Sequence, residues 1–510
     1  MNLVHDPWIP VITTAGQRRT VGLSALFAEA GELANIEGDA PHIRVALLRL
    51  LLAILHRANL GPRSLVEWEQ WWRGPAQPFE RAVSYLDARA DDFELFHPDR
   101  PFWQCPALTE AHAREAAKLV PSLASGDNRV WFDHTSVVKP ASLRFDEAAR
   151  WLVALQMFQP GGLMTGFSSS RASGEHAPLA GSAVVSWAGG DLAETLILNT
   201  LIYEPSKAPF EAEGEDLPVW EREPPAGEPV RRTPAGYLDW LTWPSRRVRL
   251  FPDGDRIEQV AITPGDALPP GLEASSYEQM VPRRRARDRD PFRPVRYDPD
   301  RALLREATAL LLRNPSAGEE LWKRAPVVSH LDRLVGYGTV PRERPLLLMV
   351  AGLGVNKSKY VDWGEEGLGV SAGLVADESL AWLVYRATEA AEAAVDAAGY
   401  AARRSYVGDR RNAAAGVATR CRSRAWGLLE LAFDEFLARL PADASAAVSS
   451  WADSLRQAVY RAFESTAAPA ASGRELRMRV EAERWLRGRI SELIEELQGA
   501  AHAAKGGASP

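Results

Sequence analysis

A short polar segment between two apolar ones is the first candidate for chemistry in this chain. Residues 346–355 are apolar or glycine, Asn356, Lys357 and Ser358 follow, and aromatic and apolar residues resume at Tyr360. This pattern predicts a strand, a turn at the Gly-x-Gly of residues 352–354 and a second strand. An amide or ammonium group on a narrow hairpin is a donor suited to the DNA minor groove, where A·T pairs present only acceptors. The alternative is a plain hairpin end.

The stretch 159–182 is rich in glycine and serine and is predicted to be a loop. Loops of this length inside a compact domain are usually functional or disordered. Because glycine has no Cβ, the backbone can approach a phosphate or a base edge, and successive N–H groups can form an anion-binding nest. The candidate residues are Gly161, Gly162, Thr165 and Gly166. A flexible surface loop is the alternative.

Two arginine-rich segments could contact DNA phosphates. The first, 283–296, has Phe292 and Tyr297 among its arginines, and aromatic residues interleaved with cations suit a nucleic-acid surface. The second lies near the start of a predicted helical bundle. The candidate backbone contacts are Arg283, Arg284, Arg285, Arg293, Arg296, Arg420, Arg422 and Arg424. The alternatives are a solvated loop for the first and helix–helix salt bridges for the second.

Motifs that perform catalysis are missing from the sequence. There is no GxxxxGK[ST], HExxH or GxSxG, and no Cys/His cluster at metal-ligand spacing. The nine histidines are scattered singly and are predicted to be surface or core residues. We therefore predict no catalytic residue, metal or cofactor. The competing enzyme hypothesis is a hydrolase whose site is assembled within 97–176, with His97, His134 and His176 as candidates.

The composition is that of a soluble globular protein. The chain has 510 residues, 46% hydrophobic and 25% charged, enough for two to four domains. The net charge of −7 means that any nucleic-acid contact must come from local basic patches. Two distant cysteines, Cys105 and Cys421, predict a reducing cytoplasm. The start of the chain does not resemble a signal peptide, and the apolar run 45–55, which contains Arg49, predicts a buried helix and no membrane span.

The elements that must position these residues can be outlined from periodicity. We expect helices at 21–31, 41–58, 146–158 and 299–313, and strands at 3–11, 246–251 and 344–350. After residue 372 proline almost vanishes, and four stripes with i, i+3/i+4 spacing begin near residues 380, 429, 451 and 486. The predicted fold class is α+β: a large mixed α/β N-terminal domain (1–371) and a C-terminal four-helix bundle (372–510).

An ordered series of motifs resembles a known family, the large subunit (CasA) of the type I-E CRISPR surveillance complex, Cascade. The series is "NLVHDPWIPV", "LSALF", "ALLRLLLAILH", "FELFHPDRPFWQ", "FQPGGLMTGF" followed by "LILNTLIY", and "GLGVNKSKY". It covers most of the chain. The alternative within this reading is the large subunit of another type I subtype.

The resemblance implies a function without catalysis. The family reads the protospacer-adjacent motif (PAM) from the minor groove, opens the duplex for the guide RNA and recruits the CRISPR helicase-nuclease. By position, Asn356 matches the PAM-reading asparagine, Lys357 falls at the wedge, and Ser358 at a small residue facing the groove. Gly161, Gly162, Thr165 and Gly166 fall in the glycine loop that reads the motif through its backbone.

The resemblance also implies partners. A loop around 129–139 matches one that docks toward the guide RNA and neighbouring subunits, which assigns Arg129, Trp131, Phe132 and His134 to that role. The counterpart of a lysine finger falls within 293–301. The expected partners are other Cascade subunits, guide RNA, double-stranded DNA and the helicase-nuclease. Two departures from the family are Lys357, where some relatives have glutamine, and a less glycine-rich "GGLMTGF" loop.

Overall fold

The computed structural model describes most of the chain. The exceptions are residues 122, 124–140, 169, 204–213, 273, 275–276, 288, 299–309, 312–319, 357–358, 407–410, 468–471 and 506–510.

The helices are α1 (Leu23–Ala28), α2 (Pro41–Asn59), α3 (Leu65–Arg73), α4 (Ala76–Ala88), α5 (Phe145–Phe158), α6 (Leu192–Asn199), α7 (Tyr237–Leu241), α9 (Pro326–Gly336), α10 (Ala372–Ala376), α11 (Glu378–Arg404), α12 (Arg411–Arg439), α13 (Ala444–Thr466) and α14 (Gly473–Lys505). The strands are β1 (Ile9–Thr13), β2 (Arg18–Val21), β3 (Leu33–Ile36), β4 (Arg114–Glu115), β5 (Leu143–Arg144), β6 (Gly162–Thr165), β7 (Arg171–Gly174), β8 (Ala183–Ala188), β9 (Arg246–Asp253), β10 (Arg256–Pro264), β11 (Arg283–Arg284), β12 (Arg293–Pro294), β13 (Trp322–Lys323), β14 (Pro345–Asn356) and β15 (Lys359–Ser371).

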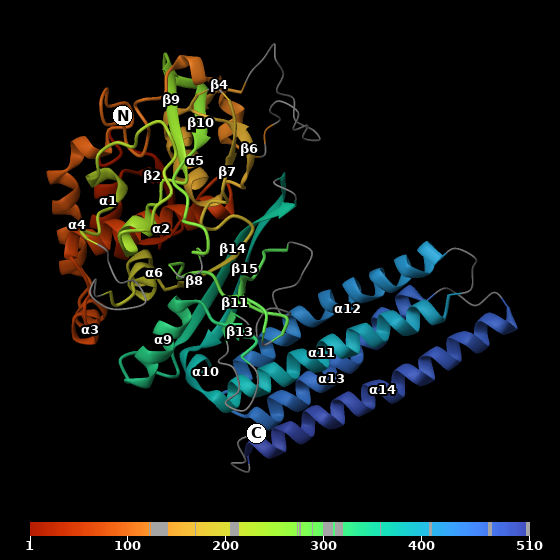
Figure 1. Cartoon of the computed structure of the whole chain (residues 1–510). Coiled ribbons are helices and arrows are strands. Elements are labelled where there is room, and N and C mark those ends of the chain that lie inside the picture. Colours follow the sequence, from red (N-terminus) through yellow and green to blue (C-terminus); the bar gives the residue numbers. More distant parts are fainter. Residues whose placement is uncertain are drawn as a thin grey trace.

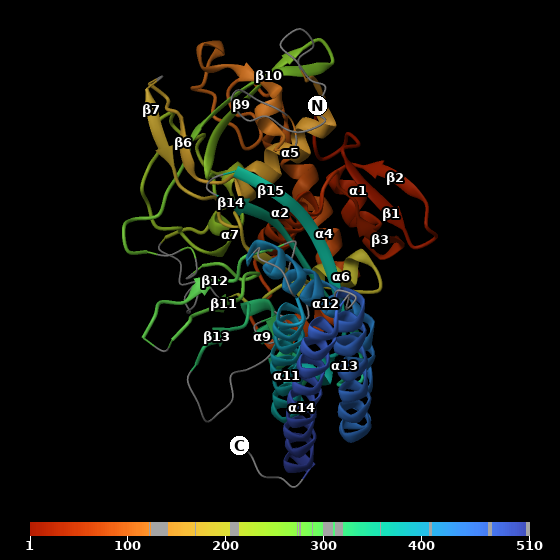
Figure 2. The same ribbon diagram turned by 90° about the vertical axis from the view of Figure 1, so that its right-hand side faces the viewer.

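The chain forms a broad mixed part and a long helical part that projects from it (Figure 1). The mixed part contains several small antiparallel sheets, with strand orders β2-β1-β3, β4-β10-β5 with β9 beside β10, β12-β11-β13 and β15-β14-β8, and the hairpin β6-β7. Viewed from the side, α2 and α5 lie among the strands of the upper mixed part, β11–β13 lie lower beside α9, and α11–α14 extend away (Figure 2). The predicted α+β fold class is confirmed.

Helix α2 lies at the centre of the mixed part. Pro41 occupies its first turn, as expected for a residue that lacks a backbone donor, and apolar residues on every side of the helix are buried. Arg49 is also fully buried, where its Nη1 lies 2.8 Å from Oε1 of Glu278. The run 45–55 is thus the predicted core helix. Within the described residues, no helix combines the length and the apolarity needed to cross a bilayer.

The four long C-terminal helices pack on one another, and they begin and end near the predicted breaks. Their centre is aromatic: the Trp451 ring lies 5.5 Å from Phe433 and 5.7 Å from Phe436. Asp377 and Asp443 cap α11 and α13 by accepting hydrogen bonds from backbone amides of the first turn. The predicted helix at 299–313 lies mostly outside the described residues, and the domain boundary after residue 371 stays a prediction.

An unusual buried imidazole joins α2 to its neighbours. The His42 ring lies 5.4 Å from Trp151 and Phe158 of α5 and 5.3 Å from Trp363 of β15. Neither of its ring nitrogens has a hydrogen-bond partner. Burial among these rings lowers the pKa of His42 to about 4, because the charged form would lose its hydration.

We predict that this imidazole makes the protein sensitive to acid. Between about pH 6.5 and 4 the unfolded chain protonates His42 while the folded chain does not, so the free energy of unfolding falls as the pH is lowered through this window. Urea unfolding at several pH values should show a shallower pH dependence for His42→Leu than for wild type. The exposed His5→Leu is the control. An unchanged slope in His42→Leu would contradict a buried neutral imidazole.

Candidate nucleic-acid interface

The strands β14 and β15 form a long hairpin, here called the ribbon, that carries the candidate residue Asn356 at its end. The two strands pair antiparallel from Pro345 opposite Ser371 to Asn356 opposite Lys359, which leaves a two-residue connection. Strand β8 pairs with β14 only as far as Gly352, so beyond this point the ribbon is two-stranded and projects from the mixed part (Figure 1). The predicted hairpin is confirmed, but the predicted turn at residues 352–354 is wrong, because the strand runs through them.

The glycines of the ribbon accommodate an aromatic ring. Gly352 and Gly364 are direct partners across the two strands. The Tyr297 side chain lies over both, and a Cβ on either glycine would overlap it. Glycine within a strand often marks such a close approach. Burial in this position raises the pKa of the Tyr297 hydroxyl to about 12.

The other side of the ribbon is fixed to the core. Ala351 and Leu353 lie on the face of β14 opposite Gly352 and are buried. Arg44 of α2 forms an ion pair with Glu365 of β15. The two-stranded end of the ribbon therefore extends from strands that are packed against the core and α2.

The end of the ribbon lies beside the glycine-rich stretch. The pairing register shifts between Leu353 and Val355, and such an irregularity bends a strand and redirects its side chains. The hydroxyl of Tyr360 donates to Oε1 of Gln159 at 2.7 Å, and Val355 lies against Gly181. In both views the end of the ribbon points toward β6 and β7 (Figures 1 and 2). The structure thus brings together two regions that the sequence separates by about 190 residues.

The stretch predicted to be a loop contains the β6–β7 hairpin, here called the glycine hairpin. Gly162 pairs with Gly174 and Thr165 with Arg171. Strands of only four residues give little periodicity, so the sequence did not indicate them. The amide of Gly161 donates to Nδ1 of His176 at 3.1 Å.

A second amide of the glycine hairpin is also engaged: that of Gly166 donates to the carbonyl oxygen of Ser170 at 2.7 Å. Because the Gly161 and Gly166 amides already have partners within the chain, neither contributes to an anion nest in this structure, contrary to the prediction.

The segment 283–296 uses its aromatic residues internally. The Phe292 ring lies between two cations, with the Arg285 guanidinium carbon 4.6 Å and the Lys323 Nζ 4.5 Å from its centroid. The Tyr297 ring packs on Gly352 and Gly364 of the ribbon. Both aromatic rings of this segment thus have contacts within the chain, and whether the segment is a nucleic-acid surface or a solvated loop stays open. The arginines are placed as follows: Arg283 and Arg285 are half-buried, and Arg284, Arg293 and Arg296 are exposed.

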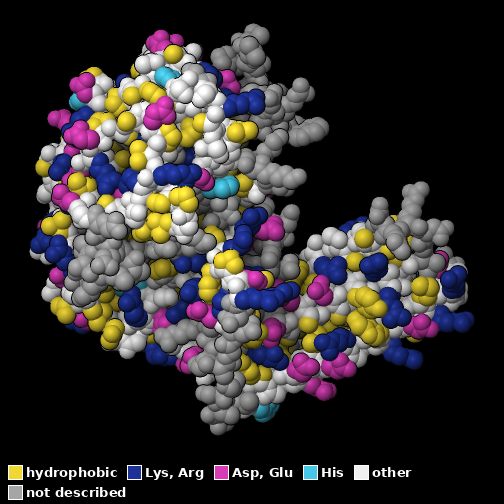
Figure 3. Space-filling view, in the orientation of Figure 1, with side chains coloured by type: hydrophobic (Ala, Val, Ile, Leu, Met, Phe, Trp, Pro, Cys, Tyr) yellow, Lys and Arg dark blue, Asp and Glu magenta, His cyan; other side chains and the backbone are white. Residues whose placement is uncertain are grey.

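The arginines of α12 differ in their surroundings. Nε of Arg422 lies 2.8 Å from the Asp396 carboxylate of α11, and its side chain covers Gly399. Arg422 therefore forms the helix–helix contact that was the alternative prediction. Arg420 and Arg424 are exposed. On the face drawn in Figure 3, Lys and Arg alternate with Asp and Glu, and an open recess separates the bundle from the mixed part.

Several predicted residues lie outside the described part of the chain. These are Lys357, Ser358, Arg129, Trp131, Phe132 and His134. The sequence analysis missed the supporting contacts of Gln159, Tyr360 and Arg246, since no local pattern marks them. The glycines at 352 and 364 were the available signal for Tyr297, because glycine in a strand indicates a close neighbour.

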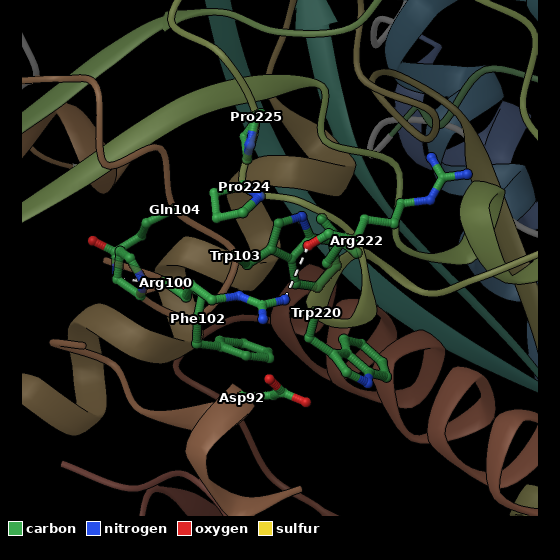
Figure 4. Close-up of a pocket in the computed structure, with 11 residues that line it drawn as sticks. Asp92, Arg100, Phe102, Trp103, Gln104, Trp220, Arg222, Pro224 and Pro225 are labelled. Atoms are coloured by element: carbon green, nitrogen blue, oxygen red, sulfur yellow. Dashed lines mark hydrogen bonds between the residues drawn. The ribbon is translucent and has the colours of Figure 1, made fainter. Parts of the chain in front are cut away.

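The region proposed for a hydrolase includes a small pocket between the loop at 100–104 and residues 219–225 (Figure 4). Its volume of about 20 Å³ holds little more than one water molecule. Phe102, Trp103 and Trp220 form much of its lining. Its carboxylate, Asp92, pairs with Arg89 at 2.9 Å.

The histidines offered for that hydrolase have structural contacts. Nδ1 of His97 accepts hydrogen bonds from the amides of Asp99 and Arg100, and Nδ1 of His176 accepts the one from Gly161. His134 lies outside the described residues. Across the described parts of the chain, no three His, Cys, Asp or Glu side chains are grouped so that they could hold a metal ion.

This architecture, a mixed part with a projecting ribbon followed by a four-helix bundle, is that of solved CRISPR-associated Cse1 proteins. The structure of Thermobifida fusca Cse1 matches with a TM-score of 0.82 at 27% identity, covering 98% of both chains. That of Acidimicrobium ferrooxidans Cse1 matches with a TM-score of 0.80 at 25% identity, covering 98% of this chain and 99% of the other.

The sequence comparisons agree. The model of the family "CRISPR-associated protein Cse1" matches residues 2–462. The chain is 31% identical to a CRISPR-associated protein CasA/Cse1 of Thermus thermophilus, over 98% of each chain. The chain therefore belongs to the CRISPR-associated Cse1 family, also called CasA, and the predicted family is confirmed.

The glycine pair of the ribbon gives a testable prediction. In Gly352→Ala the new methyl group would displace Tyr297, and we expect a loss of about 1–3 kcal/mol in the free energy of unfolding. Gly369→Ala on the same ribbon is the matched control, because a Cβ there meets nothing within 4 Å. Thermal or urea unfolding of both variants measures the difference. Equal free energies of unfolding for the two variants would show that the packing of Tyr297 does not depend on glycine at position 352.

Proposed function

We propose that this protein is the large subunit of a type I-E surveillance complex and that it reads the PAM in double-stranded DNA with the ribbon. The observation that carries the proposal is the projecting hairpin with its two-residue connection directly after Asn356. A two-stranded end is narrow enough for the minor groove, and an asparagine amide there is a donor for the acceptors that A·T pairs present.

After recognition, Lys357 would enter the base step next to the motif, while Ser358 would face the groove. Inserting a side chain there costs a few kcal/mol of stacking, offset by contacts that bent DNA permits. Minor-groove readout is degenerate, so the motif should be relaxed, and the target sequence is left to guide pairing. The opened step would then start the R-loop.

The remaining roles follow from the family resemblance. The glycine hairpin, with Gly161, Gly162, Thr165 and Gly166, would contact the duplex beside the ribbon. The contacts of its flanking residues Gln159 and Gly181 with Tyr360 and Val355 of the ribbon support this. Residues 129–134, with Arg129, Trp131, Phe132 and His134, would dock toward the guide RNA and neighbouring subunits. The complex would act in the cytoplasm and recruit the helicase-nuclease, without catalysis by this chain. We propose the domain boundary at residues 371–372.

The DNA would lie in the recess between the mixed part and the bundle (Figure 3). The mixed part, which carries the ribbon, forms one border of this recess. The bundle forms the other, and its helix α12, which carries Arg420 and Arg424, packs against β15. Exposed Arg293 and Arg296 lie on the segment that leads into Tyr297. These cations would hold the duplex through its phosphates, with an affinity that falls as salt is raised.

The central prediction concerns Asn356. Replacing it by alanine should lower the preference for PAM-containing over scrambled duplex about tenfold, because one base-edge contact contributes about 1–3 kcal/mol of discrimination. The measurement is equilibrium binding of both duplexes by the reconstituted guide-loaded complex.

Asn35→Ala, an exposed asparagine on β3, is the matched control and should discriminate like wild type. Assembly of the complex is checked in parallel, so that lost binding is not confused with lost subunits. An Asn356→Ala complex that assembles and discriminates normally would remove the ribbon from PAM recognition.

A second prediction concerns the phosphate contacts. Arg293→Gln together with Arg296→Gln should weaken binding of all duplexes alike, and the slope of log affinity against log salt should become shallower by about 2. PAM preference should remain.

The control is Arg18→Gln with Arg19→Gln, which removes the same charge from β2, a strand that lies away from β12 (Figure 2). If the two double variants show the same salt slope as wild type, Arg293 and Arg296 do not contact phosphates.

A further inference from the structure

A buried arginine lies between the glycine hairpin and the sheet behind it. Arg246, the first residue of β9, is only 2% exposed. Its Nη2 donates to the carbonyl oxygens of Gln159, Pro160 and Glu175 at 3.2, 2.9 and 2.8 Å, and its Nη1 to that of Ser245 at 2.7 Å. One guanidinium therefore connects the chain entering the glycine hairpin with the chain leaving it.

The chemistry of this contact requires a guanidinium. The planar group offers several donors in fixed directions, which can serve carbonyls from separate segments at once. Burial lowers the pKa of Arg246 to about 10, so it remains charged at neutral pH. The nearby Glu175 carboxylate lies 2.9 Å from Arg231 instead, and Arg246 is stabilised by carbonyl dipoles.

The same segment is also joined to the ribbon. Gln159 accepts from Arg246 with its backbone oxygen and from the Tyr360 hydroxyl with its side-chain oxygen, at 2.7 Å. Tyr360 pairs across the ribbon with Val355, next to Asn356. A continuous path of contacts thus runs from the glycine hairpin through Gln159 to the end of the ribbon.

We propose that Arg246 and Tyr360, joined through Gln159, are positioning residues that hold the glycine hairpin and the ribbon in one fixed arrangement. The inference rests on the proposed function, in which both elements contact the same duplex. If the two elements are held in a fixed arrangement, both can bind a correctly spaced motif without further ordering. If they move independently, part of the binding free energy is lost in ordering them. Arg246 and Tyr360 would therefore act on PAM discrimination without touching DNA.

The first experiment tests the connection without DNA. Tyr360→Phe removes the hydroxyl that donates a hydrogen bond to Gln159 and keeps the aromatic ring. Amide hydrogen exchange in the free protein should become faster over residues 159–176, because local opening of the glycine hairpin requires less free energy. Tyr385→Phe is the matched control: it removes a hydroxyl that donates to Glu389 at the same distance, 2.7 Å, within α11. Unchanged exchange in Tyr360→Phe would overturn the connection.

The second experiment tests positioning. In the guide-loaded complex, Tyr360→Phe should lower the ratio of PAM to scrambled affinity several-fold and leave the affinity for scrambled duplex unchanged. Arg246→Lys, which keeps the charge and some donors, should lower the ratio less than Arg246→Met. A purely structural role would reduce assembly or both affinities together.

The outcomes separate this inference from the proposed function. Faster exchange with a normal PAM ratio in Tyr360→Phe would overturn the positioning role while leaving PAM recognition by the ribbon intact. A normal ratio in Asn356→Ala would instead refute the proposed function. Faster exchange and a reduced ratio in Tyr360→Phe, with Tyr385→Phe like wild type, is the result expected.

Discussion

A two-stranded hairpin has little stability of its own in water, and this constraint explains how the ribbon is built into the molecule. Among the strands that the structure describes, none pairs with the ribbon beyond Gly352, so other contacts must support it. On one side Tyr297 lies across the paired glycines, and on the other Glu365 and Trp363 are held by Arg44 and His42 of α2. The ribbon is therefore supported from two sides, by helix α2 on one face and by Tyr297, next to the arginine-rich segment, on the other.

This support suits the role proposed for the ribbon. If residues at its end are inserted at a base step, the ribbon must not bend away, and the contacts of Tyr297 and Tyr360 would oppose such bending. Electrostatics serve a different purpose. The chain is negative overall, so the proposed attraction of DNA depends on local groups of cations, such as the exposed arginines on the segment before Tyr297 and on α12.

Much of the fold could be predicted because strong periodicity reflects burial. The apolar run of α2 and the four stripes of the bundle predicted their helices, since each buries a defined face. The glycine hairpin could not be predicted because strands of only four residues are too short to show a periodic pattern. Gly352 lies within a strand rather than a turn, and its neighbour Tyr297 is more than fifty residues away in sequence. The internal contacts of Phe292 could not be predicted for the same reason: composition shows which groups are available but not which are already engaged.

The most direct test of the account is a site-specific cross-link from position 356. A photoreactive amino acid placed there in the guide-loaded complex would be irradiated on PAM-containing duplex, and the modified nucleotides would be mapped on both strands. The account predicts cross-links to the PAM base pairs that disappear when the PAM is scrambled. Cross-links that fall outside the motif, or that are the same with and without it, would contradict the central claim that the end of the ribbon reads the DNA.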